Sequence, residues 1–156
     1  MTEAPKTVAA FWDAARKAVP GLGEAYAVKR LGTSQDIAER LAALIVSGEK
    51  TGTFTLPWLH SRHPDWIPRA GQLVVYTDHN DVPQALIRQR APIFMRYDQI
   101  GAAETACEGP GARDPNVWRE IHWPYWTAQL KGYDLAPSPD MPVCVELFTL
   151  LYPKAS

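Results

Sequence analysis

The junction at Gly48 constrains the fold more than any other feature of the sequence. Before it, apolar residues recur at helical spacing and predict a helix from about Ser34 to Ser47, with Thr33 as the capping residue. After it, threonines alternate at positions 51, 53 and 55, which predicts a strand with hydroxyl groups on one face. Gly48 is typical of the position just past a helix end, where the backbone turns left-handed. The chain therefore passes from an amphipathic helix into a strand within a few residues.

Similar patterns divide the rest of the chain into helices and strands that do not alternate strictly. This order disfavours a doubly wound parallel sheet and predicts a single α+β domain, with a mixed or antiparallel barrel flanked by helices. Residues 21–33 are expected to form a loop. The predicted strands span residues 51–55, 72–77, 83–91, 93–96 and 143–152. The predicted helices span residues 1–20, 34–47, 98–106, 114–123 and 125–131.

Prolines limit regular structure in two places. Pro124 removes a helix hydrogen bond, so the last helix is expected to kink or break near Trp123. Prolines bound the segment 57–68, in which we expect no regular structure but a flexible loop that covers a pocket. Two histidines and an aspartate within this segment match known metal-ligand spacings poorly, so we predict no metal ion.

The composition fits one globular domain. The chain has 156 residues, of which 46% are hydrophobic and 21% charged, enough for a sizeable core. Its net charge of -1 argues against coating of nucleic acid by bulk charge and leaves room for a local basic groove. Two cysteines, Cys107 and Cys144, are too few for a disulfide framework. No apolar run is long enough to span a bilayer and no signal-peptide pattern occurs, so we predict a cytoplasmic protein without membrane contact.

The first predicted helix carries an apolar stripe that must pack against another surface. The members of the stripe are Val8, Phe11, Trp12, Ala15 and Val19. The stripe predicts either an extra layer on the barrel or a dimer surface, which makes the protein a monomer or a homodimer.

Lys50 and Thr53 are the first candidate functional residues. A lysine at a helix-to-strand junction can polarise an oxyanion, bind a phosphate or act as a base, and a nearby threonine offers a nucleophilic hydroxyl. In a regular strand, however, positions three apart point to opposite faces. Lys50 and Thr53 therefore meet only if Gly52 permits a bulge, or if the long lysine side chain reaches round from the turn.

An ordered set of motifs extends from this junction to the end of the chain. Its members are Gly48-x-Lys50-x-x-Thr53, Pro68-x-x-Gly71, Ala106-Cys107-Glu108-Gly109, Trp118-Arg119-x-x-His122 and the closing strand from Glu146 to Tyr152. In order and spacing the set resembles the ASCH domain family, small RNA-associated proteins with a PUA-like β-barrel. The resemblance implies an ASCH-like domain over residues 34–156, with an added N-terminal helical extension over residues 1–33.

The resemblance also implies an activity. Several ASCH proteins hydrolyse the amide of acylated cytosine nucleosides, and their catalytic group, carried over by motif, is Lys50, Thr53 and Glu108, with no cofactor. The implied function is therefore an amidohydrolase acting on small nucleosides of the acetylcytidine type. Another family member is described as a ribonuclease, so the alternative is an RNA-binding module or single-strand ribonuclease that uses the same cleft.

Amide hydrolysis requires a nucleophile, a proton shuttle and stabilisation of an oxyanion. Thr53 supplies the nucleophile in this interpretation. Either Lys50 is the base and Glu108 orients it, or Glu108 handles the proton and charged Lys50 binds the oxyanion; the residues alone leave both assignments open. Stacking, cationic and imidazole side chains complete the expected substrate site. They are Trp58, Arg88, Trp118, His122 and Tyr125.

Overall fold

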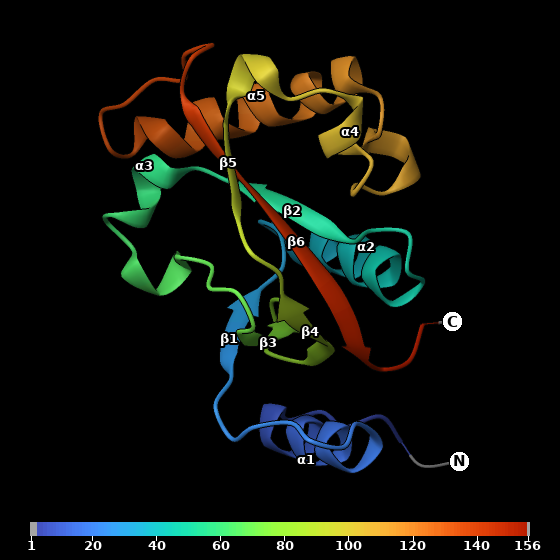
Figure 1. Ribbon diagram of the computed structural model, residues 1–156. Helices are drawn as coiled ribbons and strands as arrows, with labels where there is room; N and C mark the ends of the chain where they lie inside the picture. Colours follow the sequence, from blue (N-terminus) through green and yellow to red (C-terminus); the bar gives the residue numbers. More distant parts are fainter. Residues whose placement is uncertain (1–2, 156) are drawn as a thin grey trace. The chain divides into compact units, whose positions relative to one another are not determined.

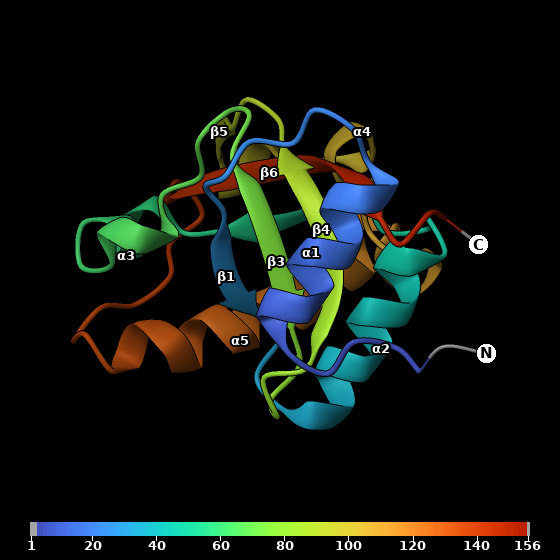
Figure 2. The ribbon, with the colours of Figure 1, turned by 90° about the horizontal axis from the view of Figure 1, so that it is seen from below.

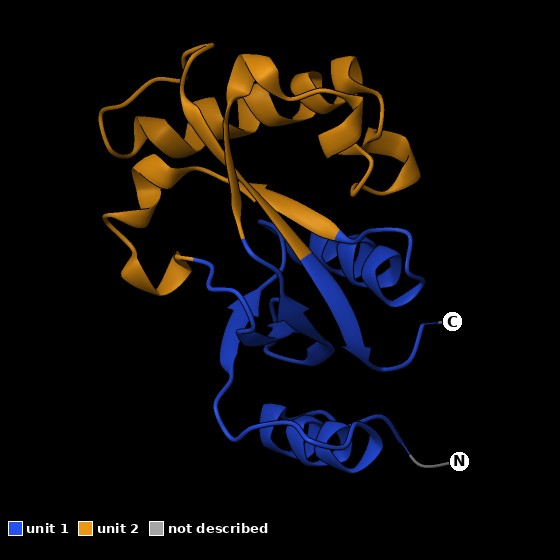
Figure 3. Cartoon of the chain, viewed as in Figure 1, with its two compact units in different colours: residues 1–51, 68–91, 148–156 blue, residues 52–67, 92–147 orange. Residues whose placement is uncertain are grey.

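The computed structural model describes residues 3–155 of the chain. It divides the chain into two compact units, which Figure 3 distinguishes by colour. Unit 1 comprises residues 1–51, 68–91 and 148–156, and unit 2 comprises residues 52–67 and 92–147. Among the described residues, no helix combines the length and the apolar character that a membrane crossing requires.

Unit 1 contains a mixed four-stranded sheet. Its strands follow the order β1-β3-β4-β6, and Figure 2 shows the first three side by side. They are β1 (Ala27–Arg30), β3 (Leu73–Thr77), β4 (Pro83–Gln89) and residues 148–152 of β6 (Pro142–Tyr152). β1 pairs with β3 in parallel, whereas the other pairs are antiparallel. The predicted loop over 21–33 was therefore wrong at 27–30, because four residues at a sheet edge carry too short an alternation to be recognised.

Two helices cover opposite faces of β3 and β4. α1 (Val8–Ala18) packs Phe11, Trp12 and Ala15 against a cluster that contains Leu73, Val75 and Leu86. α2 (Gln35–Val46) packs against residues of the other face, such as Val74 and Ile87. The apolar stripe of the first helix therefore packs against residues of unit 1.

The caps of α2 follow from local chemistry. Ser34, and not Thr33, is the N-terminal cap, because its backbone is extended and its hydroxyl accepts a hydrogen bond from the Ile37 N–H at 3.3 Å. Gly48 follows the helix with a φ of 84°, which confirms the predicted left-handed residue.

Asp78 organises the turn between β3 and β4. Its carboxylate accepts hydrogen bonds from the backbone N–H groups of Asn80 and Val82, both at 2.9 Å, and from the Gln35 side chain at 3.1 Å. Burial raises the pKa of Asp78, but these three hydrogen bonds and the electrostatic interaction with His79 together outweigh burial, so the pKa lies below its ordinary value. A group of this kind contributes stability above its unfolded-state pKa, and the contribution is lost as the pH falls through the folded-state pKa.

We expect Asp78→Asn to lower the free energy of unfolding at pH 7 by about 1–3 kcal/mol, the cost of weakening a buried hydrogen-bonded carboxylate. The difference from the wild type should shrink at acidic pH, where Asp78 is protonated in both the folded and the unfolded chain. Urea unfolding at several pH values measures this, with the exposed Asp13→Asn as a control. A difference that stays constant down to acidic pH would contradict the assigned role.

Unit 2 contains a three-stranded antiparallel sheet, in which the first part of β6 lies between two partners. Its strands are β2 (Gly52–Thr55), residues 142–147 of β6, and β5 (Ile93–Arg96). α5 (Pro115–Lys131) runs along this sheet in Figure 1, and its residues share one core with those of β2 and β6. The short helices of the unit are α3 (Pro57–His60), η1 (Pro64–Trp66), η2 (Tyr97–Gln99), α4 (Ala102–Thr105) and η3 (Pro110–Ala112).

Three expectations for unit 2 were wrong. The segment 57–68 contains regular turns, because a proline at the first position of α3 and of η1 fits a helix start, where no N–H is needed. α5 runs without a break through Pro124, since the surrounding core holds both halves in one helix. The helix expected over 98–106 is two pieces, η2 and α4, separated at Gly101.

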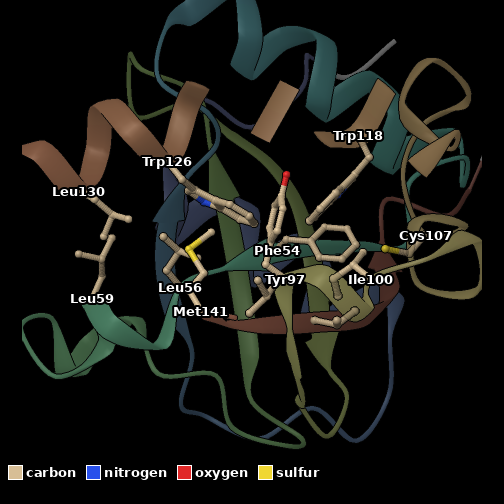
Figure 4. Packing of buried hydrophobic residues seen from close by; sticks show 12 residues of the cluster. Phe54, Leu56, Leu59, Tyr97, Ile100, Cys107, Trp118, Trp126, Leu130 and Met141 are labelled. Carbon is tan, nitrogen blue, oxygen red and sulfur yellow. The ribbon is translucent and has the colours of Figure 1, made fainter. Parts of the chain in front are cut away.

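Aromatic side chains dominate the core of unit 2. Trp118 and Trp126 of α5 are 0% and 1% exposed, and Phe54 of β2 meets the Trp118 ring edge-on at 4.9 Å. Tyr97 packs against both tryptophans, and Figure 4 shows these rings gathered between α5 and the sheet. The core therefore fixes the position of β2, the strand that carries Thr53.

Candidate functional site

Lys50 lies in unit 1, in the turn that follows α2. Its backbone N–H donates to the Leu44 carbonyl at 2.9 Å, so the lysine is anchored to the end of the helix. Its side chain is nearly enclosed, since the residue is 5% exposed. β2 begins two residues later at Gly52, and its pairing with β6 has no bulge. The sequence allows two ways for Lys50 to meet Thr53. The first, a bulge at Gly52, is absent. The second, a lysine side chain that reaches round from the turn, stays a prediction.

Thr53 lies in the middle of β2, half-buried, in unit 2. It stands directly opposite Glu146 in the antiparallel pair, and Thr55 stands opposite Cys144. Because side chains alternate along a strand and directly opposite residues share a face, Thr53, Thr55 and Glu146 point to one side of the sheet. Phe54 points to the other side, into the aromatic core.

Glu108 lies after α4, and its carboxylate is close to an imidazole. Its Oε1 is 3.7 Å from His122 Nε2, and the two side chains are only 8% and 14% exposed. The Nδ1–H of His122 donates to the Trp118 carbonyl at 2.9 Å, and the two rings stack at 4.5 Å. Trp118 and His122, four residues apart in α5, thus lie on one face of the helix. With Nδ1 acting as the donor, the Nε2 atom of His122 is the one that faces the carboxylate.

A glycine brings the segment before Glu108 against the start of β2. A β-carbon at Gly52 would lie 2.9 Å from Cys107 Sγ and 2.9 Å from Leu147 Cδ2. Only glycine permits this close approach, so the choice of residue at position 52 serves packing. Glu108 therefore follows directly on a residue that touches the first position of the strand carrying Thr53.

The other predicted substrate-binding residues differ in their surroundings. Trp118 is wholly buried and its ring stacks on that of His122. Trp58 is half-buried and packs against the same core. Tyr125, 41% exposed, lines a cavity of unit 2. Arg88 is exposed on β4 in unit 1 and lines a groove of that unit together with Arg69. Contacts of these side chains with a substrate stay predictions.

Sequence reasoning missed a polar cluster around Thr55. Its hydroxyl donates to Glu146 Oε2 and lies 3.1 Å from His60 Nε2, and both partners are buried. Thr55 and His60 also line a small cavity of about 50 Å³, with aromatic walls from Trp66, Tyr125 and Trp126. The sequence does contain one indication of this cluster, which is Glu146 within the apolar strand β6. A buried ionisable side chain rarely occurs without a polar partner.

The histidines of the segment 57–68 have partners other than a metal. His60 contacts Thr55, whereas His63 Nε2 bonds the Tyr133 hydroxyl and its ring stacks on Trp66 at 3.8 Å. No group of three or more possible metal ligands occurs among the described residues.

Comparisons with known proteins agree on the family and the fold. The family model of the ASCH domain matches residues 27–152. A crystal structure of an ASCH domain from Lactobacillus crispatus superimposes with a TM-score of 0.83 at 23% identity, covering 93% of this chain and 94% of that one. A crystal structure of a protein from Enterococcus faecalis does so with a TM-score of 0.81 at 26% identity, covering 92% and 86%. No curated protein gives a significant match.

These similarities confirm the expected α+β, PUA-like fold. The matched residues begin at the first residue of β1 and end at the last residue of β6, so they include every strand of both units. They also contain the junction after α2, the segment around Glu108 and helix α5. The chain belongs to the ASCH domain family.

Proposed function

We propose that the protein is a cytoplasmic amidohydrolase that removes the acyl group from the exocyclic amine of acylated cytosine nucleosides, acetylcytidine among them. Lys50, Thr53 and Glu108 form its catalytic group, and Trp58, Arg88, Trp118, His122 and Tyr125 serve substrate binding. The reaction type comes from the ASCH family, whose members are linked to hydrolase or RNA-related roles.

The observation that carries the proposal is the buried pairing of Glu108 with His122. The Glu108 carboxylate lies 3.7 Å from the His122 imidazole, and a carboxylate beside an imidazole is a pairing that general acid–base catalysts use. A surface that only binds RNA has no need of such a pair away from water. The neighbouring contact between Gly52 and Cys107 brings the segment of Glu108 against the strand that carries the candidate nucleophile.

This pairing favours one of the two role assignments. In that assignment Glu108, with His122 beside it, handles a proton of the reaction. Charged Lys50 then stabilises the oxyanion that forms when Thr53 attacks the acyl carbon. The proton of the Thr53 hydroxyl itself requires a further acceptor in this scheme.

A second candidate function is binding or cleavage of single-stranded RNA. It is favoured by a groove of about 610 Å³ in unit 1, which is lined by Arg69 and Arg88. Two guanidinium groups in one groove can contact phosphates of a nucleic-acid backbone. The overall charge of -1 weighs against it, because RNA binding draws much of its affinity from an excess of basic side chains.

Incubation of the purified protein with acetylcytidine, followed by chromatography, tests the proposal. Cytidine and acetate should appear in equal amounts, and the rate should be proportional to the protein concentration. A parallel incubation with single-stranded RNA, and a binding titration at several salt concentrations, tests the second candidate. Trimming of RNA without any release of cytidine would replace the amidohydrolase by the ribonuclease.

A further inference from the structure

Two carboxylates lie near β2, but only one of them shares a face with the Thr53 side chain. Glu146 stands directly opposite Thr53 across the antiparallel pair, where β-carbons are about 4.5–5.5 Å apart. Glu108, by contrast, pairs with His122, whose ring lies 5.7 Å from the ring of Phe54. Phe54 points away from the Thr53 face, so the Glu108–His122 pair belongs to the opposite side of the strand.

Glu146 is held by a directional chain of hydrogen bonds. The hydroxyl of Thr55 donates to Glu146 Oε2, and a hydroxyl has only one proton to donate. The contact of 3.1 Å between Thr55 Oγ1 and His60 Nε2 must therefore run from His60, whose Nε2–H donates to Thr55. Protons thus point from His60 to Thr55 and from Thr55 to Glu146.

With these hydrogen bonds in place, Glu146 can still act as a proton acceptor for Thr53. A carboxylate accepts about four hydrogen bonds, so it can hold the bond from Thr55 and still take the proton of a neighbouring hydroxyl. Glu146 is 3% exposed and lies between Val145 and Leu147, a place where a carboxylate is costly unless it is needed and supported. The hydrogen bonds from Thr55, and from His60 to Thr55, fix the carboxylate of Glu146 at the face of β2 that carries the threonine hydroxyls.

We propose that Glu146 is the carboxylate that takes the proton of Thr53, and that Thr55 and His60 are the positioning residues that aim it. This assignment rests on the proposed function. As Thr53 Oγ1 forms its bond to the acyl carbon, its proton passes to Glu146 and the carbonyl electrons form the oxyanion. The oxyanion collapses, the carbon–nitrogen bond breaks, and the leaving nitrogen takes the proton that Glu146 received from Thr53.

The second half of the reaction restores every group. Water attacks the acyl carbon of the threonine ester and gives its proton to Glu146. The carbon–oxygen bond to Thr53 then breaks, and Oγ1 regains its proton from Glu146. The sum is an amide and water converted to an amine and a carboxylic acid, with the enzyme unchanged.

Kinetics on acetylcytidine test the assignment. Glu146→Gln preserves the shape of the side chain but removes the proton acceptor, so kcat should fall about a hundredfold or more while KM changes little. Thr55→Val should lower kcat about tenfold through loss of one orienting hydrogen bond, and Thr55→Ser, which keeps the hydroxyl, should restore it. Thr127→Val removes an exposed hydroxyl of α5 and should leave both constants unchanged.

His60 is tested with one variant that keeps a hydrogen-bond donor and one that lacks it. His60→Gln retains an N–H that can reach Thr55 and should keep most of the rate, whereas His60→Phe should lose as much as Thr55→Val. If Thr55 and His60 only stabilised the fold, Thr55→Ser and His60→Gln would not both restore kcat while KM stays unchanged. Circular dichroism establishes that each variant is folded.

The outcomes separate this inference from the proposed function. Cytidine release by the wild type, with unchanged kcat in Glu146→Gln, would overturn the inference alone. Should Glu146→Gln fail to fold, unchanged kcat in Thr55→Val would overturn it instead. Absence of cytidine release by the wild type would remove the proposed function, and this inference with it.

Discussion

Thr53→Ala is expected to lose at least about a hundredfold in the rate of cytidine release, because the proposed reaction then lacks the hydroxyl that attacks the acyl carbon. Thr53 is half-buried in the middle of a strand whose position the aromatic core fixes, so removal of one hydroxyl and one methyl should leave the fold intact. Thr53→Ser retains the nucleophile and should keep measurable turnover. The measurement is the initial rate on acetylcytidine, with circular dichroism as the folding control.

Lys50→Ala and Glu108→Ala should suffer losses of similar size, since each removes a charge that acts only in the transition state. Lys50→Arg should fail as well, because a planar guanidinium cannot reproduce the compact charge of an ammonium group at an oxyanion. Thr127→Val, on the exposed side of α5, is the matched control for all of these variants. Near-normal turnover in Thr53→Ala would exclude threonine as the nucleophile, and near-normal turnover in Lys50→Arg would exclude a shape-specific role for the lysine.

Trp118→Ala is expected to destabilise the protein by about 3–5 kcal/mol, which is the usual cost of deleting a large buried aromatic ring. The side chain is fully enclosed and contacts Phe54, Tyr97, His122 and Trp126. Its loss would open a cavity at the point where α5 meets β2. Because His122 stacks on this ring at 4.5 Å, activity should fall together with stability.

Trp118→Phe is the matched variant for this prediction. The indole N–H of Trp118 is buried and has no hydrogen-bond partner among the described residues, and such a group costs about 1–3 kcal/mol. Phenylalanine removes that donor while keeping an aromatic ring, so the gain offsets part of the lost packing. Urea unfolding should show Trp118→Phe to be clearly more stable than Trp118→Ala. Equal stability of the two variants would show that the ring contributes no specific packing.

Local patterns determined much of the secondary structure. The helix before Gly48, the strand after it and the closing strand β6 follow from spacing that any single segment displays, and all three are present. The helix expected from residue 114 begins there as well, because the Asp114 side chain caps α5 and a proline fits its first turn. The motif order also indicated the ASCH family, which the family model confirms.

Tertiary packing decided the features that contradict local rules. Pro124 costs α5 a hydrogen bond, yet the core around Trp118, Trp126 and Leu130 holds the helix continuous. The four residues of β1 become a strand only because β3 offers them a parallel edge. In both places, energy from contacts distant in sequence outweighs the local preference.

The candidate site shows the same division. Lys50, Thr53 and Glu108 could be predicted from the sequence because each lies in one of the ordered family motifs. The neighbours of Glu108 and Thr53 cannot be predicted in this way, because they come from residues far away along the chain. His122 is close to Glu108, and Glu146 lies opposite Thr53. A strand alternates its side chains by a local rule, but only the register between β2 and β6 determines which carboxylate shares a face with the threonine, because that register is set by tertiary pairing.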